Sequence, residues 1–199
     1  MSQEFRQVRL HEIADVNEFV SPITQEESIN MRSPAEKVVT DFHKVQPITI
    51  SKSAPLDEAH ELMKSQHVRL LLAVDQQDEF VGVITSREVL GRNAMAYMQQ
   101  NGIAREDVQV KHIMVPKKRL SAITLEQVKQ VKIGDIMQTL SASGEQHLLV
   151  VDSAASTKKI CGIISASDVS RRLKVGFDVL LGAKSFADVE KVVVGAASF

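Results

Sequence analysis

Apolar and polar positions follow the same order in two blocks of the chain. Each block has an apolar run, a polar turn, a second apolar run with one glycine, and then a helical pattern. The runs are Leu70–Val74 and Phe80–Ile84 in the first block, and Leu148–Val151 and Lys158–Ile164 in the second. Continuous apolar runs of this length predict buried strands, and short polar connections predict hairpins. The chain is therefore expected to repeat one strand-rich unit twice.

The second run of each block ends in the same residue types. FVGVITSREVLGR at Phe80–Arg92 corresponds to ICGIISASDVSRR at Ile160–Arg172, with a constant offset of 80. Each segment ends its strand with a hydroxyl residue, has an acid three positions later and continues as a helix. These pairs are Thr85 with Glu88 and Ser165 with Asp168.

Further elements flank these hairpins in the same order. In the first unit we expect a capped helix beginning at Ser33, a strand at Pro47–Ile50, a helix beginning at Leu56, and a closing helix at Ser86–Gln100 that stops at Gly102. In the second unit we expect a lead-in at Val110–Val115, a strand at Ser121–Thr124, a longer connection at Leu125–Lys132, a helix marked by Ile133 and Leu140, and a closing helix at Ala166–Lys174.

The two ends of the chain lie outside the repeat. Apolar residues from Leu10 to Val20 have helical spacing, and a second helix is expected from Ser185, with Phe186 and Val193 on one face. That face either covers the protein's own sheet or contacts a dimer mate or a regulated partner. The expected division is an N-terminal extension (1–32), two repeats (33–102 and 103–176) and a C-terminal helical tail (177–199).

Composition excludes several classes of protein. The 199 residues carry a net charge of -1, which provides no basic field for nucleic acid or an anionic membrane surface, and no apolar run approaches the roughly 20 residues of a membrane span. The single Cys161 excludes an internal disulfide, so a soluble cytoplasmic protein is expected. The six histidines have no metal-ligand spacing, and no set of acid, base and nucleophile emerges, so we expect neither a metal site nor an enzyme.

The repeated order of strand, helix, strand, strand and helix resembles a tandem cystathionine-β-synthase (CBS) domain pair, or Bateman module. The similar stretches are LLLAVDQQDEFVGVITSREV, HLLVVDSAASTKKICGIISASDV and the VKHIMV lead-in, which cover most of residues 33–175. The resemblance implies an α/β fold of two β-α-β-β-α repeats packed with pseudo-two-fold symmetry. It implies small mixed sheets flanked by helices, with two clefts between them. It also implies a homodimer and a regulatory role that needs no cofactor, most often binding an adenosine nucleotide such as AMP, ADP or ATP.

The best candidate binding site is the start of the last helix of the second repeat. The first backbone N–H groups of a helix are unpaired and favour phosphate. Ser165 can donate to a phosphate or ribose oxygen, and Asp168 can accept from both ribose hydroxyls, as the acid at this place does in CBS pairs. Arg171 and Arg172 are expected on the same side of the helix, where they could meet a phosphate. The alternative is that Ser165 and Asp168 only cap the helix and that Asp168 pairs with Arg172.

The corresponding site in the first repeat is a weaker candidate. Glu88 is one methylene longer than the aspartate of the family, and with Thr85 it makes a better capping box, so capping is favoured over ligand binding here. The cleft walls are expected from the first strands and lead-ins, and these residues either sandwich a purine or belong to the core. They are Val45, Pro47 and Ile48 for one cleft, and Val115, Leu120 and Ser121 for the other. The basic run Lys117–Arg119 either meets a polyphosphate or forms a solvated loop.

Two hypotheses of different classes follow. The first is a regulatory module that senses an adenosine nucleotide in the cleft between two CBS repeats. The alternative is a ligand-free protein-interaction or scaffolding module whose apolar ends bind a protein partner.

Overall fold

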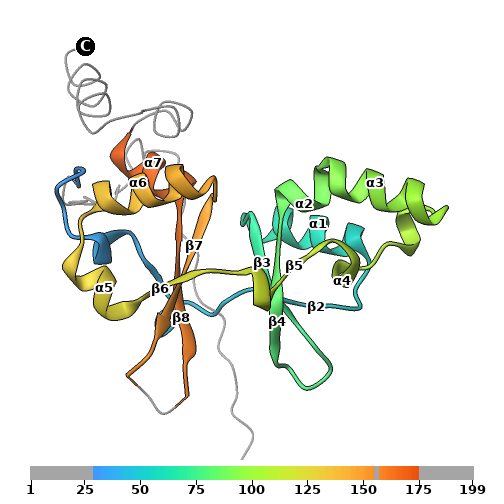
Figure 1. Cartoon of the computed structure of the whole chain (residues 1–199), viewed down its shortest axis with the longest axis horizontal. Helices are drawn as coiled ribbons and strands as arrows, with labels where there is room; N and C mark the ends of the chain where they lie inside the picture. The colour runs from blue at the N-terminus through green and yellow to red at the C-terminus, as the bar shows by residue number, and fades with distance from the viewer. Residues whose placement is uncertain (1–28, 155–156, 175–199) are drawn as a thin grey trace, which may run out of the picture.

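The computed structural model describes residues 29–154 and 157–174, which form two α/β lobes lying side by side (Figure 1). The first lobe contains β2 (Thr49–Ser51), α1 (Leu56–Ser65), β3 (Leu70–Val74), β4 (Phe80–Thr85), α2 (Ser86–Leu90), α3 (Arg92–Asn101), the 3-10 turn η2 (Arg105–Asp107), α4 (Val110–Ile113) and β5 (Val115–Pro116). The second lobe contains the 3-10 turn η1 (Ala35–Val38), β1 (Thr40–Asp41), β6 (Ala122–Thr124), α5 (Leu125–Gln130), α6 (Ile133–Ser143), β7 (His147–Asp152), β8 (Lys159–Ser165) and α7 (Ala166–Leu173). A third 3-10 turn, η3 (Lys117–Arg119), connects the lobes.

The two sheets have the same topology, which confirms the predicted fold class. Strand order is β2-β3-β4-β5 in one sheet and β1-β8-β7-β6 in the other. β3 and β4 form an antiparallel hairpin, as do β7 and β8, while β2 and β6 run parallel to their neighbours. Even the irregularities correspond, because the pairing register shifts after Ala73 in one hairpin and after Val150 in the other.

The lead-in of each repeat joins the sheet of the other repeat. β1 pairs with β8 of the second lobe, and β5 pairs with β4 of the first lobe. Each crossing strand passes very close to a glycine: a Cβ at Gly82 would lie 2.4 Å from the Val115 carbonyl oxygen, and one at Gly162 would lie 2.9 Å from the Thr40 carbonyl oxygen. The glycine that both repeats carry in this run therefore makes room for the exchanged strand.

Helices cover the outer face of each sheet, and the inner faces of the two sheets meet. Each lobe has its own apolar core, and a third cluster joins the lobes, centred on Leu72, Val83 and Leu149. Leu72 and Leu149 occupy equivalent positions in the two repeats, each in the middle of the first strand of its hairpin. Burial of this inner cluster holds the lobes together and places the two candidate sites beside the seam between them.

Two expected helices differ from the structure. The segment from Ser33 forms only a four-residue 3-10 turn, and the Ser33 hydroxyl accepts from the Asn30 N–H instead of capping it. The expected helix Ser86–Gln100 is broken at Gly91, whose backbone is extended. A Cβ at Gly91 would lie 2.1 Å from the Arg87 carbonyl oxygen, so only glycine fits this sharp turn between α2 and α3. The expected stop at Gly102 is confirmed by its left-handed conformation, with φ of 62°.

Residues 125–132, expected as a connection, contain the helix α5. Thr124 and Gln127 form a capping box at its start: the Gln127 N–H donates to the Thr124 hydroxyl and the Thr124 N–H donates to the Gln127 side chain. This Thr-x-x-Gln pattern was available in the sequence as a helix signal. The strand expected at Pro47–Ile50 begins two residues later, at Thr49.

The helices expected near Leu10–Val20 and after Ser185 lie outside the described residues. Within the described part of the chain, no helix has both the length and the apolar character needed to cross a membrane.

Candidate ligand-binding clefts

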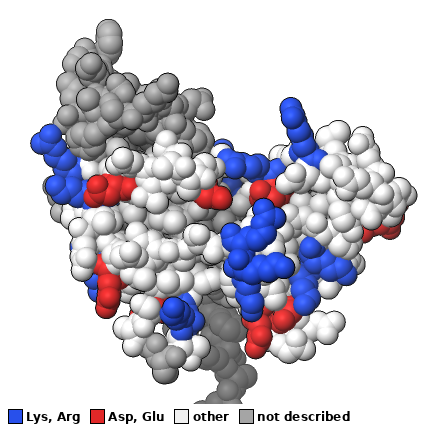
Figure 2. All heavy atoms as spheres, in the orientation of Figure 1, with Lys and Arg blue, Asp and Glu red and all other residues white. Residues whose placement is uncertain are grey.

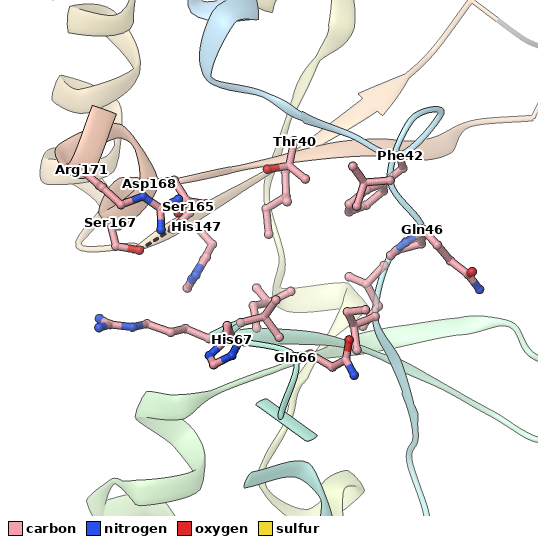
Figure 3. Close-up of a pocket in the computed structure, with 18 residues that line it drawn as sticks. Thr40, Phe42, Gln46, Gln66, His67, His147, Ser165, Ser167, Asp168 and Arg171 are labelled. Atoms are coloured by element: carbon pink, nitrogen blue, oxygen red, sulfur yellow. Dashed lines mark hydrogen bonds and ion pairs between the residues drawn. The ribbon is translucent and has the colours of Figure 1, made fainter. Parts of the chain in front are cut away.

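A cleft of about 570 Å³, here called cleft 1, opens between the two lobes (Figure 3). The second lobe contributes a polar end with Ser165, Ser167, Asp168 and Arg171. The first lobe contributes residues 66–70, from the turn after α1 into β3, and residues 45–48 approach from the segment before β2. Its volume is typical of small-molecule sites.

The polar end of cleft 1 is built by the junction of β8 and α7. The Ser165 hydroxyl lies 2.8 Å from that of Ser167, and Arg171 Nη2 donates to Asp168 Oδ1 over 2.8 Å. The Asp168 side chain is 40% exposed, so its carboxylate remains accessible from the cleft. Ser165 makes no side-chain cap bond, so the alternative in which Ser165 and Asp168 only cap the helix is not realised.

The other end of cleft 1 has apolar walls. Pro47 and Ile48 line it from one side, and Phe42 and Leu72 add further apolar surface. Figure 3 shows Phe42 and Gln46 at the end of the cavity away from Asp168 and Arg171. The cleft thus has an apolar region and, at its opposite end, a region of hydroxyl and charged groups.

A second cleft of about 370 Å³, cleft 2, lies at the corresponding place for the first repeat. Thr85 and Glu88 line it, but they form a complete capping box at the start of α2. Glu88 Oε2 accepts from the Thr85 N–H at 3.1 Å and also from the Thr85 hydroxyl. Arg87 donates to the Gly144 carbonyl of the other lobe over 3.3 Å.

The structure brings ten of the eleven predicted site residues into the two clefts. Cleft 1 receives Pro47, Ile48, Ser165, Asp168 and Arg171, and Val45 lies with them. Cleft 2 receives Thr85, Glu88, Val115, Leu120 and Ser121.

Arg172 is the exception. Its guanidinium donates to the Lys37 carbonyl in the second lobe, away from the cleft. Successive helical residues point about 100° apart, so Arg171 and Arg172 diverge. The expected pair of Asp168 with Arg172 is correspondingly replaced by Asp168 with Arg171.

The basic run Lys117–Arg119 forms the η3 turn, and Arg119 lines cleft 2. Figure 2 shows Lys and Arg side chains gathered on the face where the lobes meet, in the region of β5 and η3.

Sequence analysis missed several residues of cleft 1, among them His67, Arg69, His147 and Ser167. Their position in the sequence was the available signal. Arg69 and His147 each come just before a buried apolar run, at the edge of the sheet where α7 also begins. His147 lines both clefts. The pKa of His147 is lowered to about 4, mainly by burial; the Asp168 charge opposes this shift and those of Arg69 and Arg87 add to it, so His147 is neutral near pH 7.

Cys161 lies in the core of the second lobe, where its thiol contacts the Val150 carbonyl at 3.6 Å. Burial, with Asp152 and Asp41 nearby, raises the pKa of this thiol, which keeps it in the unreactive protonated form. No group of three or more His, Cys, Asp or Glu side chains suited to a metal ion occurs in residues 29–154 and 157–174.

Comparison with known proteins agrees with this architecture. Residues 39–103 match the family model of the CBS domain. A comparison of the sequence with curated proteins gives no match.

Among solved structures, an uncharacterized conserved protein from Pyrococcus horikoshii is similar with a TM-score of 0.54 and 20% identity, covering 72% of this chain and 93% of that one. A CBS-domain containing protein from Agrobacterium tumefaciens has a TM-score of 0.53 and 15% identity, covering 72% and 95%. The CBS-pair protein CBSX2 from Arabidopsis thaliana, in a structure with AMP, has a TM-score of 0.49 and 20% identity, covering 70% and 93%. Residues 39–103 thus match the CBS domain, and the two lobes together have the fold of the CBS-domain containing protein from Agrobacterium tumefaciens.

Proposed function

We propose that this protein is a regulatory binding module that holds an adenosine nucleotide in cleft 1. One observation carries the proposal: a cleft between the lobes joins an apolar region to an accessible carboxylate, two serine hydroxyls and an arginine. These are the groups that a purine, a ribose and a phosphate require.

Each part of the nucleotide has a place in this arrangement. The base lies between the apolar walls that include Pro47 and Ile48. Asp168 accepts hydrogen bonds from the ribose hydroxyls. Ser165 and Arg171 bind the phosphate, next to the positive end of the eight-residue helix α7. When the nucleotide binds, the ribose hydroxyls replace part of the ion pair between Asp168 and Arg171.

Regulation follows from the position of the cleft. Both lobes line cleft 1, so a bound nucleotide stabilises one spacing of the lobes over others. The size of this shift is limited by the difference between the nucleotide's affinities for the competing lobe spacings. The expected output is a change in lobe geometry, or in the contacts of a homodimer, that a regulated protein partner detects.

Calorimetric titration of the whole chain with AMP, ADP and ATP, and with GMP as a base control, tests the proposal. Arg171→Ala is the informative variant and Arg172→Ala its matched control, because the neighbouring arginine points away from the cleft. We expect at least one adenosine nucleotide to bind, Arg171→Ala to weaken binding about tenfold, and Arg172→Ala to leave it unchanged. Binding should also raise the Tm by mass action.

Absence of binding by all three nucleotides would contradict the proposal and favour the interaction module. Two large apolar side chains support that second candidate: Leu90 is 62% and Met95 56% exposed, on the outer helices α2 and α3. If that surface joins copies of this chain, Leu90→Ser combined with Met95→Ser should abolish their association, measured as mass in solution by light scattering.

A further inference from the structure

His67 has a left-handed backbone conformation that is unusual for a residue with a side chain. Its φ is 53°, in the turn between α1 and β3. The equivalent position in the second repeat, in the turn between α6 and β7, is Gly144, with φ of 69°. Glycine is the usual residue for this conformation because a Cβ is strained there.

The turn itself does not require a histidine. In the first repeat the His67 N–H donates to the Lys64 carbonyl over 3.2 Å, and in the second the Gly144 N–H donates to the Ser141 carbonyl over 3.3 Å. The backbone bond is thus the same with either residue. The His67 side chain belongs to none of the three core clusters, and within the described part of the chain no hydrogen bond to its ring is observed. Neither the turn nor the core therefore accounts for it.

The side chain is exposed and lines cleft 1 as well as a second pocket beside α1. His67 lines this cleft from the first lobe, and Figure 3 shows it across the cavity from Ser167, Asp168 and His147 of the second lobe. Arg69, two residues later, lines the same cleft. The first lobe thus presents an imidazole and a guanidinium toward the polar end formed by α7.

We propose that His67 is a ligand-binding residue that donates a hydrogen bond to the phosphate of the bound nucleotide. This inference rests on the proposed function and extends it: the phosphate is held from both lobes, by Ser165 and Arg171 on one side and His67 on the other. Strained backbone conformations are often retained at ligand-binding positions, and the positive φ of His67 agrees with this role. Cleft 2 has no counterpart, because Gly144 offers no side chain.

His67→Gly tests the inference, with Asp78→Gly as its matched control. Asp78 also has a positive φ, 58°, but lies in the turn between β3 and β4 and lines neither cleft. Both variants relieve a strained backbone, so both should fold with a Tm equal to or above that of the unchanged protein. Only His67→Gly should weaken AMP binding, by about tenfold.

Adenosine, which lacks the phosphate, separates the possible outcomes. We expect the affinity for adenosine to be the same in His67→Gly and the unchanged protein. If His67→Gly binds AMP normally while Arg171→Ala does not, the inference is wrong and the proposed function stands. Equal weakening of AMP and adenosine would overturn the phosphate contact. If the unchanged protein binds no adenosine nucleotide, the proposed function fails and the inference fails with it.

Discussion

Clefts 1 and 2 are built on one scaffold but use their acidic residue in opposite ways. Glu88 in cleft 2 receives two hydrogen bonds from Thr85 and completes a helix cap. Asp168 in cleft 1 is one methylene shorter, does not bond back to Ser165, and pairs with Arg171 while remaining partly exposed. A single methylene thus separates a carboxylate committed to capping its helix from one available to a ligand.

The same contrast extends around both clefts. When the two repeats are aligned, Arg171 of cleft 1 corresponds to Gly91, and Arg69 corresponds to Gln146. Cleft 2 has no arginine at these two places and is lined instead by Arg87 and Arg119, of which Arg87 makes a bond to the Gly144 carbonyl of the other lobe. The repeats share their backbone, and we assign the nucleotide to cleft 1 because Asp168 is accessible there beside Arg171, whereas Glu88 of cleft 2 caps its own helix.

The shared scaffold predicts the largest effect, at the two glycines beside the exchanged strands. Gly82→Ala should lower the free energy of unfolding by about 3 kcal/mol, because its Cβ would meet the Val115 carbonyl at 2.4 Å. Gly162→Ala should cost less, about 1–2 kcal/mol, since the backbone oxygen that its Cβ would meet, that of Thr40, lies farther away at 2.9 Å and the Val39 side chain at 2.8 Å can move. Urea denaturation measures both. If both variants were as stable as the unchanged protein, the tight crossing of the two strands would be contradicted.

The divergence of the clefts predicts the next effect. Asp168→Asn should weaken AMP binding about thirtyfold, or about 2 kcal/mol, because it removes a charged acceptor for the ribose. Glu88→Gln is the control and should leave that affinity unchanged, while the lost capping charge costs a few tenths of a kcal/mol of stability. A loss of affinity in Glu88→Gln of similar size would mean that cleft 2 also binds the nucleotide.

A smaller effect is expected from His147, whose equivalent in the first repeat is Leu70. The pKa of His147 is about 4 in the folded protein and about 6.5 for an unfolded histidine, because burial disfavours the charged ring. The unfolded chain therefore takes up the proton first as the pH falls. The stability contributed above pH 6.5 is lost progressively as the pH falls from 6.5 to 4.

His147→Leu should remove this part of the pH dependence. Unfolding free energies of both proteins at pH 7 and pH 4.5 give the comparison, in which the common contribution of other groups cancels. An unchanged difference between the two pH values would show that His147 is not desolvated in the folded state.

The sequence predicted the repeated elements because continuous apolar runs and paired turn residues are local signals. Leu70–Val74 is found with its predicted bounds, and the stop at Gly102 depends on one residue's conformation. The resemblance to a known family then implied that two clefts form between the repeats, and it placed Ser165 and Asp168.

The remaining features depend on contacts between distant segments. The pairing of the two-residue strands β1 and β5 with the opposite repeats leaves no periodic pattern to detect. The break at Gly91 looks like a tolerated glycine in a helix until the crowding by the Arg87 carbonyl is known. His67 looks like an ordinary turn residue until its φ and its place in cleft 1 are seen together.

The exchange of lead-in strands has a consequence for how this chain can be divided. A cut between residues 102 and 103 separates the repeats in the sequence, yet it takes β5 away from β4 and leaves β1 without β8. Each half would then expose an unprotected strand edge, which invites intermolecular pairing. We therefore expect neither half to fold stably on its own.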